Sequence, residues 1–196
     1  MTDDSFDNLV FDFEGRQLPH FIAVEGNIGV GKTTLAKRLA TTFSYQTLLE
    51  AEEENPFLER FYQDRKRNAL PTQLFFLFQR SKQFQELRQA DLFSPLRIAD
   101  FLINKDPLFA RVTLDDDEYH LYKMVYDQLI IDAPKPDLVV YLQAPVDTLI
   151  RRIRQRGVTS ERHIDHEYLQ QLNEAYTQLF HYYNETPLLI VNANDI

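Results

Sequence analysis

The sequence of 196 residues contains no cysteine. Disulfide bonds, thiolate catalysis and cysteine-ligated zinc sites are therefore excluded, and a reducing, cytoplasmic location is expected. No apolar run approaches the roughly 18 residues that a transmembrane helix requires. The N-terminus is acidic and lacks the basic start of a signal peptide. We expect no membrane partner, and we interpret residues 1–19 as an acidic N-terminal arm.

Positive charge is also scarce, because 21 lysines and arginines face 30 aspartates and glutamates, which gives a formal net charge of -9. A chain this acidic is not expected to bind nucleic acid through its overall field, so any basic site must be local. The hydrophobic content of 44% is that of an ordinary globular protein, and the length suits one domain with a sizeable core. We expect that domain over residues 20–196.

Short apolar segments alternate with helical patterns along this domain. The expected strands are residues 20–24, 46–49, 96–102, 137–144 and 188–191. The expected helices are residues 33–43, 56–68, 72–90, 115–131, 146–156 and 165–184, with a break at Pro71. Alternating strands and helices predict an α/β fold with a doubly wound, five-stranded parallel sheet and flanking helices. In such sheets ligands bind beyond the carboxyl ends of the strands.

A glycine-rich segment follows the first expected strand. It reads GNIGVGKT and matches the phosphate-binding pattern G-x-x-x-x-G-K-[ST] in full, between a strand and a helix. Its backbone N–H groups and the helix N-terminus favour a bound phosphate, which predicts a P-loop NTPase-type fold. The residues expected to bind ATP are Gly26, Asn27, Ile28, Gly29, Val30, Gly31, Lys32, Thr33 and Thr34.

The same pattern predicts a magnesium site. Lys32 is expected at the β- and γ-phosphates, and the Thr33 hydroxyl is expected to ligate Mg²⁺. A second metal anchor is expected at another strand end, where Asp100 follows an apolar strand. An ordinary turn aspartate is the alternative interpretation of Asp100.

Five motifs in fixed order carry a family resemblance. They are IAVEGNIGVGKTT, LLEAEEENPFLERFYQD, TQLFFLFQRSKQF, RIADFLINKDPLFA and RRIRQRG. From Phe21 to Val191 the chain resembles the deoxyribonucleoside kinases, above all the bacterial deoxyadenosine/deoxyguanosine kinase branch. The resemblance implies ATP-dependent, magnesium-assisted phosphoryl transfer to the 5′-hydroxyl of a deoxyribonucleoside, with a purine preferred. It also implies a short arginine-bearing lid at about residues 152–165.

The resemblance also assigns roles to individual residues. Glu50, at the end of the second expected strand, is the expected general base, although Glu52, Glu53 and Glu54 compete with it. The other residues expected to bind the acceptor are Tyr62 and Glu161 at the sugar and Gln73, Arg80 and Asp106 at the base. The alternatives are core packing for Tyr62, an exposed loop for Asp106 and a surface loop charge for Glu161.

Arginines of the expected lid complete the predicted catalytic set. Arg152 and Arg156 lie four residues apart, so both face one way, and they match the arginines that neutralise the transferring phosphate. Two positions depart from the family pattern. Phe101 stands where most relatives carry an arginine after the strand-end acid, and Val158 where many carry a lid arginine. Lys105 is our candidate to replace the first of these as a catalytic residue, and Arg162 the second.

Two other functions stay open at this point. A nucleotide-binding subunit or regulator without catalysis is favoured by Phe101. It is opposed by the intact residues Lys32, Thr33, Glu50 and Asp100. A nucleoside monophosphate kinase is opposed by the acidic stretch 50–54, which repels a phosphorylated acceptor. We also expect a homodimer through residues 72–90 and 115–131. Phe84 and Leu87 are candidates for an apolar seam, and burial inside one subunit explains them equally well. Relatives usually continue into one more helix beyond the fifth strand.

Overall fold

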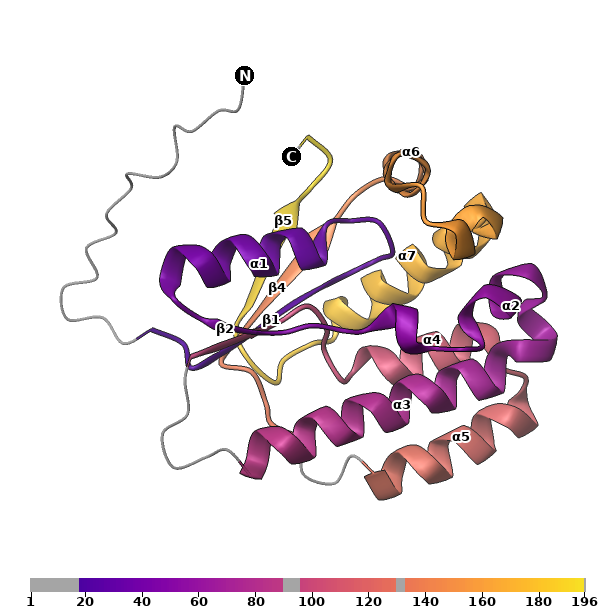
Figure 1. Cartoon of the computed structure of the whole chain (residues 1–196), viewed down its shortest axis with the longest axis horizontal. Coiled ribbons are helices and arrows are strands. Elements are labelled where there is room, and N and C mark those ends of the chain that lie inside the picture. Colours follow the sequence, from indigo (N-terminus) through magenta and orange to yellow (C-terminus); the bar gives the residue numbers. More distant parts are fainter. Residues whose placement is uncertain (1–17, 90–95, 130–132, 196) are drawn as a thin grey trace.

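The computed structural model describes residues 18–89, 96–129 and 133–195 (Figure 1). Its centre is a five-stranded parallel sheet with the order β2-β3-β1-β4-β5. The strands are β1 (Phe21–Gly26), β2 (Gln46–Leu48), β3 (Arg97–Ala99), β4 (Leu138–Gln143) and β5 (Leu188–Asn192). In register, Phe21 of β1 pairs with Arg97 of β3, and Ile22 pairs with Leu138 of β4. The predicted fold class and sheet are confirmed.

Helices cover both faces of this sheet. They are α1 (Lys32–Phe43), α2 (Leu58–Gln63), α3 (Arg65–Gln89), α4 (Lys105–Thr113), α5 (Asp116–Leu129), α6 (Val146–Arg156) and α7 (His166–His181). Two 3₁₀ helices, η1 (Glu52–Glu54) and η2 (Thr159–His163), lie in the connections. Figure 1 shows α1 lying across the strands on one side, with α3, α4 and α7 on the other.

Strand β4, which lies between β1 and the edge strand β5, shows why both faces are apolar. Its even-numbered residues Leu138, Val140 and Leu142 line a cavity beside α1. Its Tyr141 points the other way and stacks on Tyr176 and Phe180 of α7, with ring centroids 6.0 and 4.1 Å apart. A strand buried on both faces reads as one continuous apolar run, which is why the sequence predicted it within a residue or two.

The predicted helix break at Pro71 is wrong. Helix α3 runs for 25 residues through Pro71, and the break falls at Asp64, between α2 and α3. The Asp64 carboxylate accepts a hydrogen bond from the Arg67 N–H, so it caps the start of α3. Packing of α3 against α2, α4 and α5 outweighs the backbone hydrogen bond that proline removes.

Helix α4 was not predicted. The residues from Lys105 to Thr113 were assigned to no helix or strand and were interpreted as a loop after the third expected strand. It begins with Lys105 and Asp106, both buried although charged. Buried charges mark this turn as part of a polar site rather than of the apolar core. No helix within the described ranges is long and apolar enough to cross a membrane.

Candidate active site

The glycine-rich loop lies between the end of β1 and the start of α1. Gly29 has φ +78°, and a Cβ atom there would lie 2.8 Å from Ile153 of α6, so only glycine fits. Asn27 anchors the loop to α7, donating to the Leu169 carbonyl at 3.0 Å and to Asn173 Oδ1 at 2.7 Å. The loop is therefore held in a turned conformation by α6 and α7 before any anion binds.

Lys32 opens α1 beneath this loop. Its Nζ donates to the Asn27 carbonyl at 3.2 Å. Burial lowers the Lys32 pKa, and the nearby charge of Lys105 lowers it further, while Glu25, Glu52 and Glu50 oppose the shift. An anionic phosphate beside Lys32 would relieve both unfavourable effects, since it supplies the missing opposite charge.

Asp100 joins three elements at the carboxyl edge of the sheet. It follows β3, its Oδ2 accepts the Thr33 hydroxyl at 2.5 Å, and its Oδ1 accepts the Glu50 N–H at 2.8 Å. The turn-aspartate interpretation does not describe this buried position. No group of three or more acidic or histidine side chains forms a metal site among the described residues. Thr33 and Asp100 instead suit Mg²⁺, which takes few protein ligands beside phosphate and water.

A cavity of about 730 Å³ opens above the phosphate loop. Arg152 and Arg156 of α6 both line it, as their spacing predicted. Arg152 donates to the carbonyls of Val30 at 3.2 Å and Ala193 at 2.7 Å. Away from the loop the wall is apolar and includes Leu39 and Val140. A cavity of this size, with a cationic end and an apolar end, suits a nucleotide.

A second, smaller cavity of about 40 Å³ lies beside the first. Its lining includes Glu50, Tyr62, Gln73, Arg80, Lys105, Asp106 and the ring of Phe76. Ile28, Lys32 and Glu52 line both cavities, so the two meet beside Lys32. The smaller cavity holds no more than a few waters. A ligand of nucleoside size therefore requires its walls to move apart.

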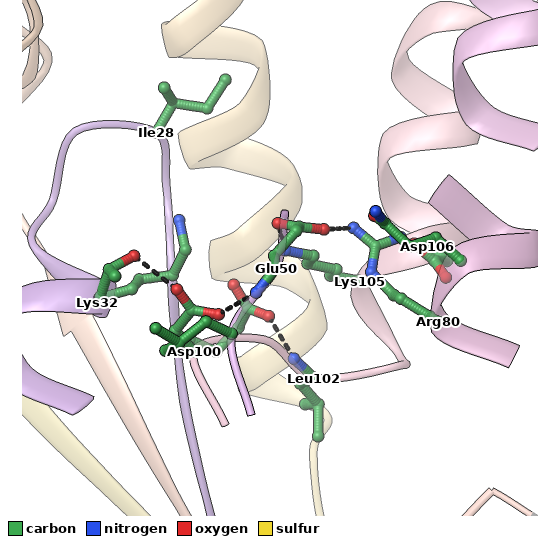
Figure 2. Close-up of polar contacts among 12 residues, drawn as sticks. Ile28, Lys32, Glu50, Arg80, Asp100, Leu102, Lys105 and Asp106 are labelled. Carbon is green, nitrogen blue, oxygen red and sulfur yellow. Dashed lines mark hydrogen bonds and ion pairs between the residues drawn. The ribbon is translucent and has the colours of Figure 1, made fainter. Parts of the chain in front are cut away.

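Four charged side chains meet at the base of the smaller cavity (Figure 2). The Arg80 guanidinium lies between two carboxylates and donates to Glu50 and Asp106. The Lys105 ammonium donates to the other Glu50 oxygen at 2.8 Å. All four side chains are at most 7% exposed. Burial alone would raise the Glu50 pKa, but the charges of Arg80 and Lys105 lower it to about 2.

Of the other predicted acceptor residues, Tyr62 and Gln73 line the smaller cavity, whereas Glu161 lines neither cavity. Tyr62 lines the cavity, and burial raises the pKa of its hydroxyl well above the usual value, so the group stays a donor. The Gln73 amide donates to the Thr113 hydroxyl at 3.3 Å. Asp106 and Glu161 are buried, and Glu161 pairs with Arg156, so interpreting either as an exposed loop charge is wrong.

Phe101 does not enter either cavity. It packs against Phe84, with ring centroids 5.8 Å apart, and its ring lies 5.9 Å from the Lys105 ammonium. Phe84 is itself 4% exposed, so of its two interpretations burial within one subunit holds and a place in a surface seam does not. The Leu87 side chain lies outside the described residues.

Two residues of the site, Glu25 and Phe76, were missed by the sequence analysis, and a third, Glu52, was considered only as an alternative base. Glu25 of β1 is fully buried and accepts hydrogen bonds from the Leu102 N–H at 2.7 Å and the Tyr176 hydroxyl at 2.9 Å, which ties β1 to both neighbouring segments. Glu52 lines both cavities, and burial beside Glu50 raises its pKa. Phe76, whose ring also lines the smaller cavity, was not among the residues predicted to bind the acceptor. The sequence signal that could have identified Glu25 as a site residue is an acidic side chain within an otherwise apolar strand.

Comparison with known proteins agrees with this geometry. The family described as deoxynucleoside kinase matches residues 22–196. The chain is 40% identical to deoxyguanosine kinase of Bacillus subtilis over 158 residues, which are 80% of this chain and 76% of that protein. It is 30% identical to deoxyadenosine/deoxycytidine kinase of Bacillus subtilis over 182 residues, 89% and 82% of the two chains.

Solved structures show the same relationship. The structure of deoxyadenosine kinase from M. mycoides with bound dATP has a TM-score of 0.78 to this chain at 30% identity, and the match covers 88% of this chain and 90% of that one. The same enzyme with the products dCMP and dCDP has a TM-score of 0.77 at 31% identity and the same coverage.

Proposed function

This chain belongs to the deoxynucleoside kinase family, and we propose that ATP is its donor, that Mg²⁺ assists and that the acceptor is a purine deoxyribonucleoside. As a member of that family, the protein transfers a phosphoryl group to a deoxynucleoside. The observation that carries this proposal is the meeting of the two cavities beside Lys32, with the Glu50 carboxylate in the smaller one. A phosphate on the loop and a hydroxyl beside Glu50 would then face each other.

Glu50 is the proposed general base. The charges around it keep it ionised throughout the physiological range, so it can accept the proton of the 5′-hydroxyl. That hydroxyl oxygen then bonds to the γ-phosphorus of ATP while the bond to the β–γ bridging oxygen breaks and ADP leaves. Lys32, Arg152 and Arg156 lie where they stabilise the negative charge of the transferring group.

Thr33 and Asp100 are the residues proposed to hold the magnesium ion. Their side-chain oxygens already lie 2.5 Å apart at the foot of the phosphate loop. Mg²⁺ bound there would neutralise charge on the β- and γ-phosphates. The buried Asp100 also accepts a hydrogen bond from the Glu50 backbone N–H. This bond fixes the position of the proposed base relative to the proposed metal site.

A purine acceptor is supported by the polar groups around the smaller cavity. Gln73 offers both an amide donor and an acceptor, and the buried Asp106 Oδ2 has no hydrogen-bond partner in the part of the chain that the structure describes. Such a set suits a base edge that presents both donors and acceptors. The relatives named above include a deoxyguanosine kinase and a deoxyadenosine/deoxycytidine kinase.

Steady-state assays with ATP, magnesium and a panel of four deoxynucleosides and their monophosphates test this proposal. We expect turnover with deoxyadenosine or deoxyguanosine and none after Lys32→Ala. Donor binding without any turnover would instead favour a regulatory subunit. Turnover with monophosphates alone would favour a nucleoside monophosphate kinase, although the buried Glu50 and Glu52 oppose an acceptor that carries a phosphate.

We further propose a homodimer formed by α3 and α5. These helices pack side by side, and three large apolar side chains on them are exposed: Phe78 at 53%, Leu121 at 48% and Met124 at 56%. Apolar side chains gathered on neighbouring helices are typical of an interface. The expected pair of helices is therefore retained, while the seam residue Phe84 is replaced by these three.

A further inference from the structure

The larger cavity extends well beyond the phosphate loop, toward the amino ends of the strands. Along β4 its lining runs from Leu138, the first residue of the strand, to Leu142, a length of about 13 Å at the usual rise of a strand. Phosphates on the loop lie at the carboxyl ends of the strands. The residues that line the opposite end of the cavity are Leu18, Pro19, Ile22, Phe43, Tyr45 and Leu138. We call this part of the cavity the apolar end.

The chemistry of the apolar end does not suit a nucleotide base. Its polar side-chain group is the Tyr45 hydroxyl, which donates to the Pro19 carbonyl at 2.6 Å. A base placed there would leave the polar atoms of its edge without hydrogen bonds, which costs free energy. The apolar end therefore suits an apolar occupant.

The cavity also reaches the edge strand β5, where apolar surface is exposed. Leu189 and Val191 of β5 line the cavity, and Leu189 is 51% exposed. Exposed apolar side chains that line a concave surface are typical of a binding site for another apolar segment.

The N-terminal arm, residues 1–19, joins the domain at the apolar end. Its last two residues, Leu18 and Pro19, are part of the cavity lining. The chain is fixed there, because Pro19 accepts the bond from Tyr45 and the His20 N–H donates to the Asp137 carboxylate at 2.7 Å. A segment that ends five residues before Leu18 can lie up to about 17 Å from it, so the preceding part of the arm can reach the cavity.

The sequence of the arm has the apolar pattern that such a site requires. Large apolar residues recur at the spacing of one helix face, at Phe6, Leu9, Val10 and Phe13. Acidic residues accompany them, namely Asp3, Asp4, Asp7, Asp12 and Glu14. Arg38, which is exposed on α1, lines the same cavity and offers these acids an opposite charge. The arm therefore matches the cavity in both hydrophobicity and charge.

We propose that residues 6–13 bind in the apolar end of the larger cavity of the same chain, with their four regularly spaced apolar side chains against the sheet. The arm covers β4 and β5 there and leaves the phosphate-loop end open. Burial of these side chains favours binding, and the covalent connection at Leu18 gives the arm a high effective concentration beside the cavity. The inference does not depend on the proposed acceptor or on catalysis.

Crosslinking in the full chain tests this position, because the sequence has no cysteine of its own. Val10→Cys is combined with Leu189→Cys in one variant and with Ile190→Cys in a matched control. Leu189 and Ile190 are neighbours with nearly equal exposure, 51% and 52%, but of the two Leu189 alone lines the cavity. With a short bis-maleimide we expect a roughly fivefold higher yield of intramolecular crosslink for the Leu189 pair. Equal yields, or no crosslink, overturn the proposal.

Two other occupants of the apolar end would give different products. If the arm of a second copy binds there, the crosslinked product on a denaturing gel has twice the chain mass of 23.2 kDa. If a nucleotide fills the apolar end, saturating ATP abolishes the crosslink of the Leu189 pair. Either result overturns the proposal, which expects a product of single-chain mass and a yield that ATP leaves unchanged.

Substitutions within the arm test its apolar face. Leu9→Asp places a charge on that face, whereas Phe11→Asp makes the same kind of change two residues further on, which is the opposite side of a helix. We expect Leu9→Asp to lower the Tm by about 5 °C and Phe11→Asp by less than about 1 °C. Equal shifts, or an unchanged Tm in Leu9→Asp, contradict the docking. None of these measurements involves turnover, so a protein that phosphorylates no deoxynucleoside would contradict the proposed function alone.

Discussion

At the scale of single residues, Glu50 links the stability of the fold to pH. Its pKa falls from 4.5 to about 2 on folding, because the charges of Arg80 and Lys105 outweigh the cost of its burial. A lowered pKa means that the ionised carboxylate contributes stability above pH 4.5. That contribution is lost as the pH falls from 4.5 toward 2.

We therefore expect Glu50→Gln to lower the free energy of unfolding at pH 7, because Arg80 and Lys105 lose their shared partner. The difference from the wild type should shrink as the pH falls below about 4.5. Urea unfolding at a series of pH values measures both effects. Glu59→Gln, an exposed change on α2, is the control and should follow the wild type throughout. A Glu50→Gln deficit that persists undiminished at low pH would contradict the assigned pairing.

The proposed role of Tyr62 can be tested by changing the sugar of the substrate. Its buried hydroxyl remains protonated and lines the acceptor cavity, where it can donate to the 3′-hydroxyl. We expect Tyr62→Phe to lower kcat/KM for a deoxynucleoside about tenfold, the effect of one hydrogen bond. With a 2′,3′-dideoxynucleoside, which lacks that hydroxyl, wild type and variant should have equal kcat/KM. An equal loss with both substrates would assign Tyr62 to packing, and the exposed Tyr182→Phe serves as control.

At the scale of elements, α6 presents its arginines to two environments. Arg152 and Arg156 line the larger cavity, although the Arg156 side chain is 44% exposed, whereas Arg151 and Arg154 line neither cavity. We expect Arg156→Met to lower kcat about 100-fold, because it removes charge that stabilises the transferring phosphate. Arg154→Met should change kcat less than twofold in the same assay. Equal effects of the two variants would mean that α6 acts through its overall positive charge, and not through the arginines that line the cavity.

The elements also show what the sequence could predict. Strands β1 and β4 were predicted nearly to the residue, because burial on both faces produces an uninterrupted apolar run. The break at Pro71 was wrong, because the propensity rule gave no weight to the packing of α3 against three other helices. Helix α4 escaped prediction since its buried Lys105 and Asp106 resemble a polar loop until their partners are known, which are Glu50 after β2 and Arg80 on α3.

The residues of the candidate site also divide into those that the sequence could predict and those that it could not. The phosphate loop and Asp100 were predictable, because their chemistry lies in a contiguous motif and at a strand end. The burial of Asp106 and Glu161 was not, since it depends on Arg80 and Arg156, which are distant in sequence or separated by a turn. Likewise, no local pattern indicated that Glu52 would line both cavities.

At the scale of the whole molecule, two groups of exposed aliphatic or aromatic side chains stand out among the described residues. One is on α3 and α5, with Phe78, Leu121 and Met124; the other is on the edge strand β5, with Leu189 and Ile190 exposed by 51% and 52%. The smaller cavity is walled by α2, α3 and α4, and α3 also carries the proposed dimer surface. A second copy on α3 would therefore stiffen one wall of the acceptor site.

The double variant Leu121→Glu/Met124→Glu tests this dimer. The two residues lie three apart on α5 and share a face, so carboxylates there would meet like charges across a two-fold interface. We expect a mass near 23.2 kDa by light scattering for the variant and twice that mass for the wild type. Ile190→Glu, which adds a charge at equal exposure on β5, should leave the dimer intact. If Ile190→Glu separates the subunits and the α5 variant does not, the interface lies on the edge strand, and α3 is free to move when the acceptor enters.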